Sequence, residues 1–210
     1  MRKLFSATLN VLLLVWLTTL TTRTFAQSKK DEMKILPAQP APTFVIKDVN
    51  NQTISLAGYK GRKVILTFYR NVGCPVCNLR FHELQEQAEY FKSKNLVLLA
   101  VYESTADNMK KYVAGENFYA AMIPNPDESL YRLYNIERSS GKLMKGMFHG
   151  AMGKMKKGKK LFATKIKQDG NGNRISADFL IDENGNIQKA YYGKFIGDHL
   201  PVAEIKQFLN

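Results

Sequence analysis

The chain has 210 residues, a formal net charge of +13, and 45% hydrophobic and 23% charged residues. This length and composition fit a single globular domain with a sizeable core. The chain has two cysteines, and its three histidines, His82, His149 and His199, are scattered. The second ligand pair that a structural zinc site needs beside the cysteines is therefore missing, and we expect neither a metal centre nor a cofactor.

The first 26 residues have the pattern of a secretory signal peptide. Arg2 and Lys3 precede a mostly apolar run over residues 4–20, and small residues at Thr24 and Ala26 suit a signal peptidase. The strongly apolar centre is shorter than the roughly 20 residues that span a bilayer. We therefore favour cleavage after Ala26 over a membrane anchor, and predict an exported protein, periplasmic or extracellular.

A short leader and a β-hairpin follow the signal peptide. Residues 27–41 are polar and then contain prolines, and we predict that they form a flexible leader to a folded domain over residues 42–210. Residues 44–46 and 52–56 are β-type runs on either side of the turn sequence 48–51. This pattern predicts a β-hairpin.

The most informative stretch is a strand followed by the two cysteines. Residues 64–69 are a continuous apolar run typical of a buried strand, and a helical pattern begins after Cys74. Three residues of spacing place Cys74 and Cys77 on one face of the first turn, within disulfide reach. Pro75 suits the first helical position. The partial positive charge of a helix N-terminus favours thiolate at Cys74, and thiolate is the nucleophile of disulfide exchange.

Other uses of the cysteine pair fit less well. Haem attachment needs a histidine directly after Cys77, where the chain has Asn78. A structural disulfide that closes so short a loop removes little chain entropy. We therefore predict redox chemistry, with Cys74 the more acidic and more exposed thiol. In an oxidising compartment the pair needs a redox partner that reduces it, or it acts as an oxidant.

The rest of the chain alternates between predicted strands and helices. Residues 96–101 form a second apolar run, so the intervening helix implies a parallel pair of strands with a right-handed crossover. We expect helices over residues 106–113, 128–134 and 202–209, and a break in regular structure over 122–127. Strands at 178–182 and 187–192, with turn residues between them, predict a closing hairpin.

Residues 139–168 differ in composition from the rest. They contain nine lysines, five glycines at positions 141, 146, 150, 153 and 158, and no acidic residue. The lysines from Lys142 to Lys167 could attract an anionic surface or partner, although a solvated, flexible loop is the simpler interpretation. We expect no nucleic-acid partner for an exported protein. Because such a segment buries little surface, we expect it to be dispensable for folding and for the thiol chemistry.

The same segment has a second set of potential ligands. Thioethers suit cuprous copper, and the segment contains Met144, Met147, Met152 and Met155 with His149 among them. Helical spacing would also place the methionines on one face, where they would pack against the domain. The glycines argue against a stable helix. A binding module that uses this segment for an anionic partner or cuprous copper is our alternative to an enzyme.

From residue 41 onward the chain resembles the alkyl hydroperoxide reductase C/thiol-specific antioxidant (AhpC/TSA) group of peroxiredoxin-like proteins. The matching pieces are Ala41-Pro42-Thr43-Phe44, Ile54-Ser55-Leu56, Gly58-Tyr59-Lys60-Gly61, Phe68-Tyr69-Arg70 and Gly73-Cys74-Pro75-Val76-Cys77, then residues 177–182, 184–187 and 197–201. The resemblance implies a thioredoxin-like three-layer α/β sandwich with a mixed sheet, helices on both faces and an N-terminal β-hairpin. It also implies a thiol-dependent oxidoreductase.

The chain departs from these families at positions close to the cysteines. Peroxiredoxins have a proline and a threonine seven and three residues before the reactive cysteine, where this chain has Thr67 and Asn71. Thioredoxins have an acidic residue on the redox strand and a cis-proline before the closing hairpin, where this chain has Phe68 and Ser176-Ala177. The pocket that orients peroxide is therefore not reproduced, and we expect disulfide exchange to exceed peroxidase activity.

Two arginines are candidate cations for the site. Arg70, four residues before Cys74, is the nearest in sequence and could stabilise the thiolate, although a surface role is equally compatible. Arg174 is a candidate for the second cation of peroxiredoxins, but its offset from the closing strand is wrong by two residues. The predicted catalytic residues are therefore Cys74, Cys77 and Arg70, and the predicted substrate is a disulfide or a peroxide.

Overall fold

The structure is a computed structural model that describes residues 34–113, 117–161 and 166–210. The folded unit runs from Ile35 to Asn210. The predicted signal peptide and the first part of the predicted leader lie outside the described residues.

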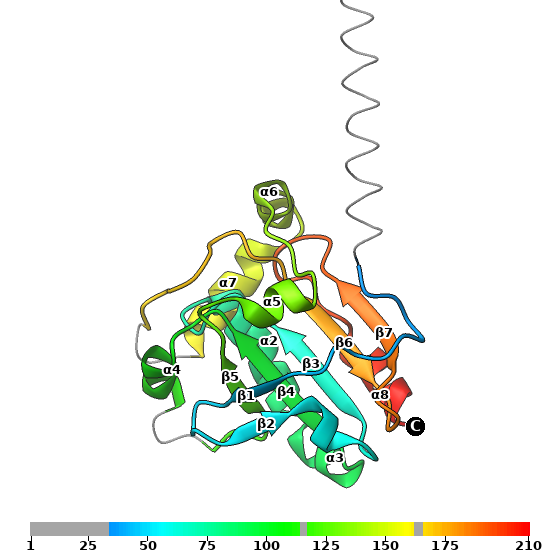
Figure 1. Cartoon of the computed structure of the whole chain (residues 1–210). Coiled ribbons are helices and arrows are strands. Elements are labelled where there is room, and N and C mark those ends of the chain that lie inside the picture. Colours follow the sequence, from blue (N-terminus) through cyan, green and yellow to red (C-terminus); the bar gives the residue numbers. More distant parts are fainter. Residues whose placement is uncertain (1–33, 114–116, 162–165) are drawn as a thin grey trace, which may run out of the picture. The chain divides into compact units, whose positions relative to one another are not determined.

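A five-stranded mixed sheet forms the centre of the fold, in the order β5-β4-β3-β6-β7 (Figure 1). Its strands are β3 (Val64–Phe68), β4 (Val97–Tyr102), β5 (Ala121–Pro124), β6 (Ala177–Ile181) and β7 (Ile187–Tyr192). Strands β3, β4 and β5 are parallel, whereas β6 pairs antiparallel with β3 and with β7. The predicted parallel pair and closing hairpin are confirmed. Every residue of β3, β4 and β6 is buried, as their apolar runs require.

Different elements cover the two faces of the sheet. One core cluster packs against α2 (Pro75–Gln85), α3 (Ala88–Ser93), α4 (Ala106–Val113) and α8 (Val202–Leu209). The other packs against α5 (Ser129–Leu133) and the hairpin of β1 (Val45–Lys47) and β2 (Thr53–Ser55), which leads into the 3₁₀ helix η1 (Leu56–Tyr59). The three-layer α/β sandwich with helices on both faces and an N-terminal hairpin is confirmed.

Two local predictions need correction. The predicted break at residues 122–127 starts later than expected, because residues 122–124 belong to the edge strand β5 and only residues 125–127 lie outside helices and strands. Pro124 lies at the last position of β5, where a missing N–H is tolerated. The described end of the predicted flexible leader is held by the β6–β7 hairpin. Ala38 N donates to Ile187 O at 2.7 Å, and Ala41 N donates to Gly185 O at 2.9 Å.

The lysine-rich segment is mostly helical. It forms α6 (Ser140–Phe148), with the Ser139 hydroxyl accepting from Lys142 N at 3.2 Å, and α7 (Ala151–Lys160). Between them Gly150 has a φ of 82°, which glycine adopts without strain. Helix α7 lies against α2 (Figure 1). The flexible-loop interpretation is therefore wrong for the described residues of this segment.

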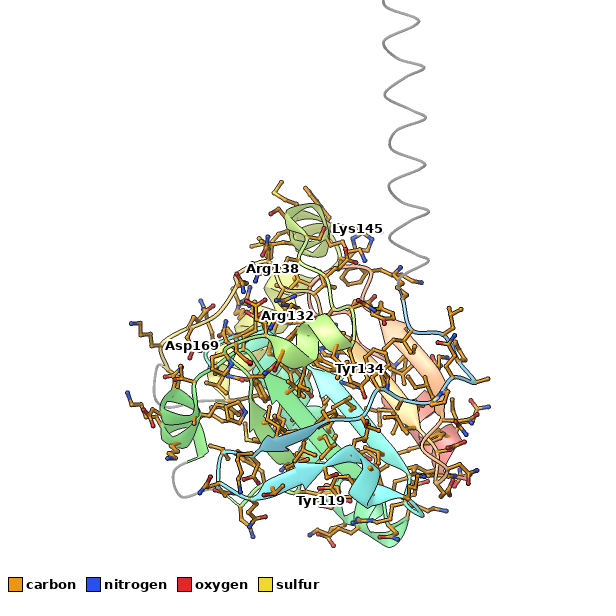
Figure 2. All side chains as sticks on the ribbon, viewed as in Figure 1. Tyr119, Arg132, Tyr134, Arg138, Lys145 and Asp169 are labelled. Carbon is orange, nitrogen blue, oxygen red and sulfur yellow. The ribbon has the colours of Figure 1, made fainter. Side chains whose placement is uncertain are left out.

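The chain after α7 returns across the end of the sheet, and we call residues 166–172 the covering segment. Asp169, labelled in Figure 2, accepts hydrogen bonds from the Ser104 hydroxyl at 2.6 Å and from Thr105 N at 3.0 Å. Asn108 Nδ2 on α4 donates to Lys167 O at 2.8 Å. These bonds hold the covering segment over the edge where β3 and β4 end. In the part of the chain that the structure describes, no helix is long and apolar enough to cross a membrane.

Candidate functional site

The cysteine pair lies at the junction of β3 and α2, as the sequence predicts. Cys74 is the N-cap residue of α2, and Pro75 is its first helical residue. The Cys77 amide donates to Cys74 Sγ at 3.4 Å, so the first turn of the helix directs a backbone N–H at the sulfur. Both cysteines are free thiols in this structure. The arrangement can stabilise a thiolate at Cys74.

Both thiols are buried, which contradicts the expectation that Cys74 is the more exposed one. The exposed fraction is 0% for Cys74 and 7% for Cys77. The covering segment passes so close that a Cβ built on Gly73 would lie 2.7 Å from Ile166 O. Helix α7 covers the other side, where a Cβ on Gly158 would lie 1.9 Å from Pro75 O. The covering segment and α7 therefore pack against the backbone on either side of Cys74, whose side chain has no exposed surface in this structure.

The acidities of the two thiols differ in the predicted direction. Burial alone raises the pKa of Cys74, but a hydrogen bond from the Cys77 thiol and the charge of Arg70 outweigh it and lower that pKa to about 6. Burial raises the pKa of Cys77 well above its usual range, and the neighbouring Cys74 sulfur adds to the effect. Near neutral pH the pair therefore combines a thiolate at Cys74 with a thiol at Cys77.

Arg70 lies beside the pair and also holds the covering segment. Its Nη1 donates to Gly172 O at 2.6 Å, and its Nη2 donates to Gln168 Oε1 at 3.3 Å. Burial lowers the pKa of Arg70, but the negative sulfur of Cys74 reverses the effect and raises that pKa. Among the described residues, no hydrogen-bond partner is available for Arg70 Nε. The structure thus brings the three predicted site residues together, and their catalytic roles remain predictions.

Arg174, the other candidate cation, is engaged elsewhere. Its guanidinium pairs with Glu103, and with Glu128 at 2.6 Å, and it donates to Ile136 O at 2.6 Å. It also lies 4.6 Å from the centre of the Tyr131 ring. These contacts tie the chain just after the covering segment to the residue that follows β4 and to the residue that precedes α5, so Arg174 has a structural role here.

A buried polar cluster that the sequence analysis does not predict lies next to the redox strand. Asp178 on β6 accepts from the Thr67 hydroxyl at 2.6 Å and from Leu200 N at 2.8 Å, and contacts His199 Nδ1 at 3.0 Å. Burial raises the pKa of the Asp178 carboxyl, but the opposing effect of His199 lowers it to about 2. The His199 ring lies 5.4 Å from the ring of Tyr69, which follows β3. The signal was a lone aspartate in an apolar strand, because a buried carboxylate requires partners.

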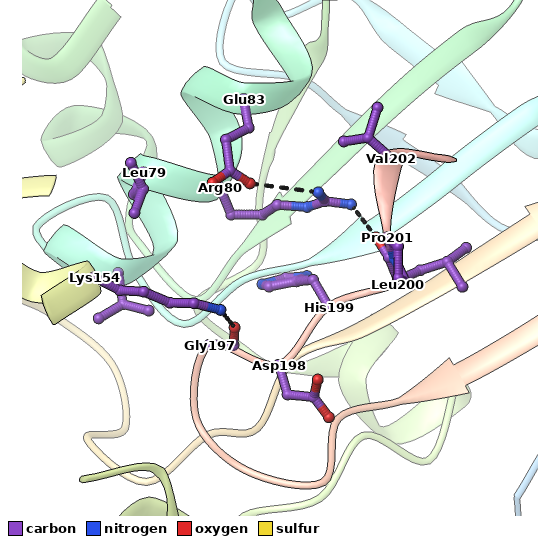
Figure 3. Close-up of a pocket in the computed structure, with 11 residues that line it drawn as sticks. Leu79, Arg80, Glu83, Lys154, Gly197, Asp198, His199, Leu200, Pro201 and Val202 are labelled. Carbon is purple, nitrogen blue, oxygen red and sulfur yellow. Dashed lines mark hydrogen bonds and ion pairs between the residues drawn. The ribbon is translucent and has the colours of Figure 1, made fainter. Parts of the chain in front are cut away.

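A cavity of about 250 Å³ opens this cluster to the surface between α2, α7 and residues 197–202 (Figure 3). Arg80 and His199 line it, and Arg80 Nη2 donates to Leu200 O at 2.5 Å. On the opposite wall, Lys154 Nζ donates to Gly197 O at 2.7 Å. The lining does not include either cysteine, so this cavity is not an entrance to the thiols.

The methionines of the lysine-rich segment are only partly brought together. Met147, Met152 and Met155 line a second cavity, which they share with Lys156 and Lys159. The two lysines have the same charge sign as a cuprous ion, which disfavours the copper alternative without testing it. In the described part of the chain, no group of three or more His, Cys, Asp and Glu residues could hold a metal ion.

Comparison with known proteins agrees with this architecture. The profile of the AhpC/TSA family matches residues 37–190. Peroxiredoxin Bcp of Bacillus subtilis is 24% identical over 178 residues, which are 85% of this chain and 97% of that protein.

Two solved structures are similar in fold. The thioredoxin domain of a thiol-disulfide oxidoreductase from Bacteroides vulgatus has a TM-score of 0.54 at 16% identity, covering 84% of this chain and 100% of that one. Reduced 2-Cys peroxiredoxin from Plasmodium vivax has a TM-score of 0.56 at 18% identity, covering 83% of this chain and 80% of that one. The fold is therefore thioredoxin-like. The family match and the curated peroxiredoxin relative support an oxidoreductase. The chain belongs to the AhpC/TSA family.

Proposed function

We propose that this protein is an exported thiol–disulfide oxidoreductase in which Cys74 is the nucleophile and Cys77 resolves the intermediate. The observation that carries the proposal is the contrast within the pair. The Cys77 amide donates to Cys74 Sγ at 3.4 Å, and the pKa of Cys74 is lowered to about 6 while that of Cys77 is raised. A nucleophile that is ionised at neutral pH beside a protonated resolving thiol suits disulfide exchange.

The reaction on a disulfide has two steps. The Cys74 thiolate attacks one substrate sulfur, the substrate S–S bond breaks, and the other sulfur leaves as a thiolate. Cys77 then loses its proton and attacks Cys74 Sγ, which releases the second substrate thiolate and leaves a Cys74–Cys77 disulfide. The substrate gains two electrons and the enzyme loses two. A redox partner returns the pair to the dithiol in the reverse sequence, or the oxidised pair passes its disulfide on.

Arg70 has two roles in this proposal. Its charge stabilises the Cys74 thiolate, and its hydrogen bonds to Gln168 and Gly172 hold the covering segment closed. Opening the covering segment would release those donors at the moment when the substrate enters. In the open state the Cys74 sulfur would be accessible to the substrate, and Arg70 would still lie beside it.

Peroxide is the weaker substrate in this proposal. The position three residues before Cys74 is Asn71, which is buried, and its Oδ1 is without a hydrogen-bond partner among the described residues. The threonine hydroxyl that orients peroxide in peroxiredoxins is therefore missing from this position, and the side chain of Asn71 puts no hydroxyl donor in its place. The loss of one such donor commonly costs about 3 kcal/mol in a transition state.

Stopped-flow measurement of thiol loss tests the choice of substrate. Reduced protein is mixed separately with 2-hydroxyethyl disulfide and with hydrogen peroxide, with the variant Cys74→Ser as control. We expect both reactions to require Cys74. At equal concentrations of the two oxidants, we expect thiol loss to be faster with the disulfide than with hydrogen peroxide. Rapid, saturable consumption of micromolar peroxide with slow disulfide exchange would instead make the protein a peroxidase.

Export has its own test. The first 26 residues have the basic start, apolar centre and small terminal residues of a signal peptide. Expression of the full chain in a Gram-negative host should give a periplasmic protein whose N-terminus begins at Gln27. Retention of the uncleaved chain in the cytoplasm would contradict export and leave the thiol chemistry untouched.

A further inference from the structure

The second cavity, between α6 and α7, is an apolar hollow on the outside of the lysine-rich segment. It has a volume of about 240 Å³ and is lined by Met147, Met152 and Met155 with Lys156 and Lys159. The exposed fractions of Met147 and Met152 are 43% and 63%. Exposed apolar side chains around a hollow mark interaction sites, and unbranched methionines adapt to varied partners.

The rim of this cavity is positively charged. Lys156, Lys157, Lys159 and Lys160 are all exposed, and within the described residues none of them forms an ion pair. Neither α6 nor α7 contains an acidic residue. Uncompensated charge of one sign attracts a partner of the other sign and accelerates their encounter. The positive charge of these lysines therefore favours a partner that carries carboxylates or other anionic groups.

The cavity is physically connected to the redox pair. Met155, which lines it, also packs against the core cluster that contains Cys74 and Cys77. One turn further along α7, Gly158 lies against the backbone of Pro75, the first helical residue after Cys74. A molecule bound in the cavity therefore contacts the helix that packs against the first turn of the cysteine helix.

We propose that this cavity, with its lysine rim, is the docking site for the protein redox partner. It receives one apolar side chain from a segment whose neighbouring residues are aspartate or glutamate. A hollow that accepts a side chain favours a protein over the flat surface of an anionic bilayer. The inference rests on the thiol–disulfide exchange proposed above, and it adds the chemistry by which the partner is recognised.

Synthetic peptides serve as probes for the unidentified partner. Each peptide carries one cysteine as a mixed disulfide with 5-thio-2-nitrobenzoate. The Cys74 thiolate attacks the peptide sulfur, the bond to thionitrobenzoate breaks, and the coloured thiolate that leaves is measured. One peptide has a leucine flanked by glutamates, a second has lysines in place of the glutamates, and a third has serine in place of the leucine. The neutral 2-hydroxyethyl disulfide measures thiol reactivity without docking.

We expect the glutamate–leucine peptide to react about tenfold faster than either other peptide at low salt, with the advantage shrinking as salt screens the charges. The double variant Lys156→Glu/Lys159→Glu should lose this preference, measured as the ratio of the peptide rate to the hydroxyethyl disulfide rate. The control Lys60→Glu/Lys94→Glu changes the net charge equally, at exposed lysines next to η1 and α3. It should keep both the preference and the basal rate.

The results distinguish failure of the docking site from failure of the proposed thiol–disulfide exchange. Equal rates for all three peptides, with normal reaction of hydroxyethyl disulfide, would overturn the docking site and leave the oxidoreductase intact. No reaction with hydroxyethyl disulfide would overturn the proposed function first. Binding of anionic phosphatidylglycerol vesicles that Lys156→Glu/Lys159→Glu abolishes, without any peptide preference, would assign the surface to a bilayer and also overturn the proposal.

Discussion

Gly158 of α7 lies directly against the carbonyl group of Pro75, in the first turn of the cysteine helix. A Cβ built on Gly158 would be 1.9 Å from that oxygen, a separation that real Cβ atoms do not show. Only glycine lets α7 come this close to α2. The contact joins the lysine-rich segment to the site of the thiol chemistry.

The substitution Gly158→Ala tests this contact. The added methyl group must push α7 away from α2, and overpacking of this kind typically costs about 1–3 kcal/mol of unfolding free energy. The matched control is Gly153→Ala on the same helix, where a Cβ would meet nothing within 4 Å. There alanine should stabilise by about 0.5–1 kcal/mol, because it is the better helix former. Urea denaturation measures both, and equal effects would show that α7 does not pack as described.

Replacing residues 142–165 with a short Gly-Ser linker gives a second test. From composition we expected little change in stability, but the structure predicts the opposite. Loss of α7 uncovers Pro75 and the cluster that contains Cys74 and Cys77. The reduced variant should melt several degrees lower, and Cys74 should react faster with a small alkylating agent. An unchanged melting temperature with an unchanged alkylation rate would contradict the described packing.

The substitution Arg70→Met should raise the pKa of Cys74. It removes the charge that helps to lower that pKa to about 6, and it also frees the covering segment from the bonds to Gln168 and Gly172. The pH at which alkylation of Cys74 is half-maximal should move up by at least about one unit. Arg70→Lys keeps a charge and should shift it less. An unshifted profile in Arg70→Met would exclude Arg70 as the stabilising cation.

The variant Asp178→Asn probes the buried cluster through acid stability. The pKa of Asp178 is lowered from its ordinary value to about 2, so the ionised carboxylate stabilises the folded state above about pH 4. This contribution is lost as the pH falls from 4 through 2. The variant should lack that part of the acid sensitivity. The variant should also be less stable at pH 7 by about 1–3 kcal/mol, because the asparagine amide replaces the buried carboxylate that accepts hydrogen bonds from Thr67 and Leu200. Parallel acid profiles would argue against a buried Asp178–His199 pair.

The strand, the cysteine helix and the acidity of Cys74 could be predicted from the sequence because they depend on neighbouring residues. The apolar run of β3, the N1 proline and the spacing of the cysteines together define the junction. The burial of Cys74 and the hydrogen bonds of Arg70 both depend on the covering segment, which follows Cys74 in the chain by about ninety residues. No local pattern shows which distant segment covers a site.

The flexible-loop prediction for the lysine-rich segment is wrong because glycine occurs both in flexible segments and where two parts of the chain pack closely. By composition its glycines predict flexibility, but Gly146 and Gly158 are buried, and they lie against Ile196 and Pro75, respectively. Composition cannot separate the two cases, since close approach depends on tertiary contacts. The Asp178–Thr67 bond joins residues 111 apart in sequence and becomes visible only when the register of β3 and β6 is known.

The central claim is that Cys74 is the ionised nucleophile and Cys77 the protonated resolving thiol. Alkylation of each cysteine in the reduced protein, followed by mass spectrometry across the pH range 4–10, tests it most directly. We expect Cys74 to be labelled first, with a half-maximal rate at a pH close to its pKa of about 6, and Cys77 to resist labelling until far higher pH. Labelling of Cys77 first, or of both cysteines with a common midpoint above pH 8, would contradict the account.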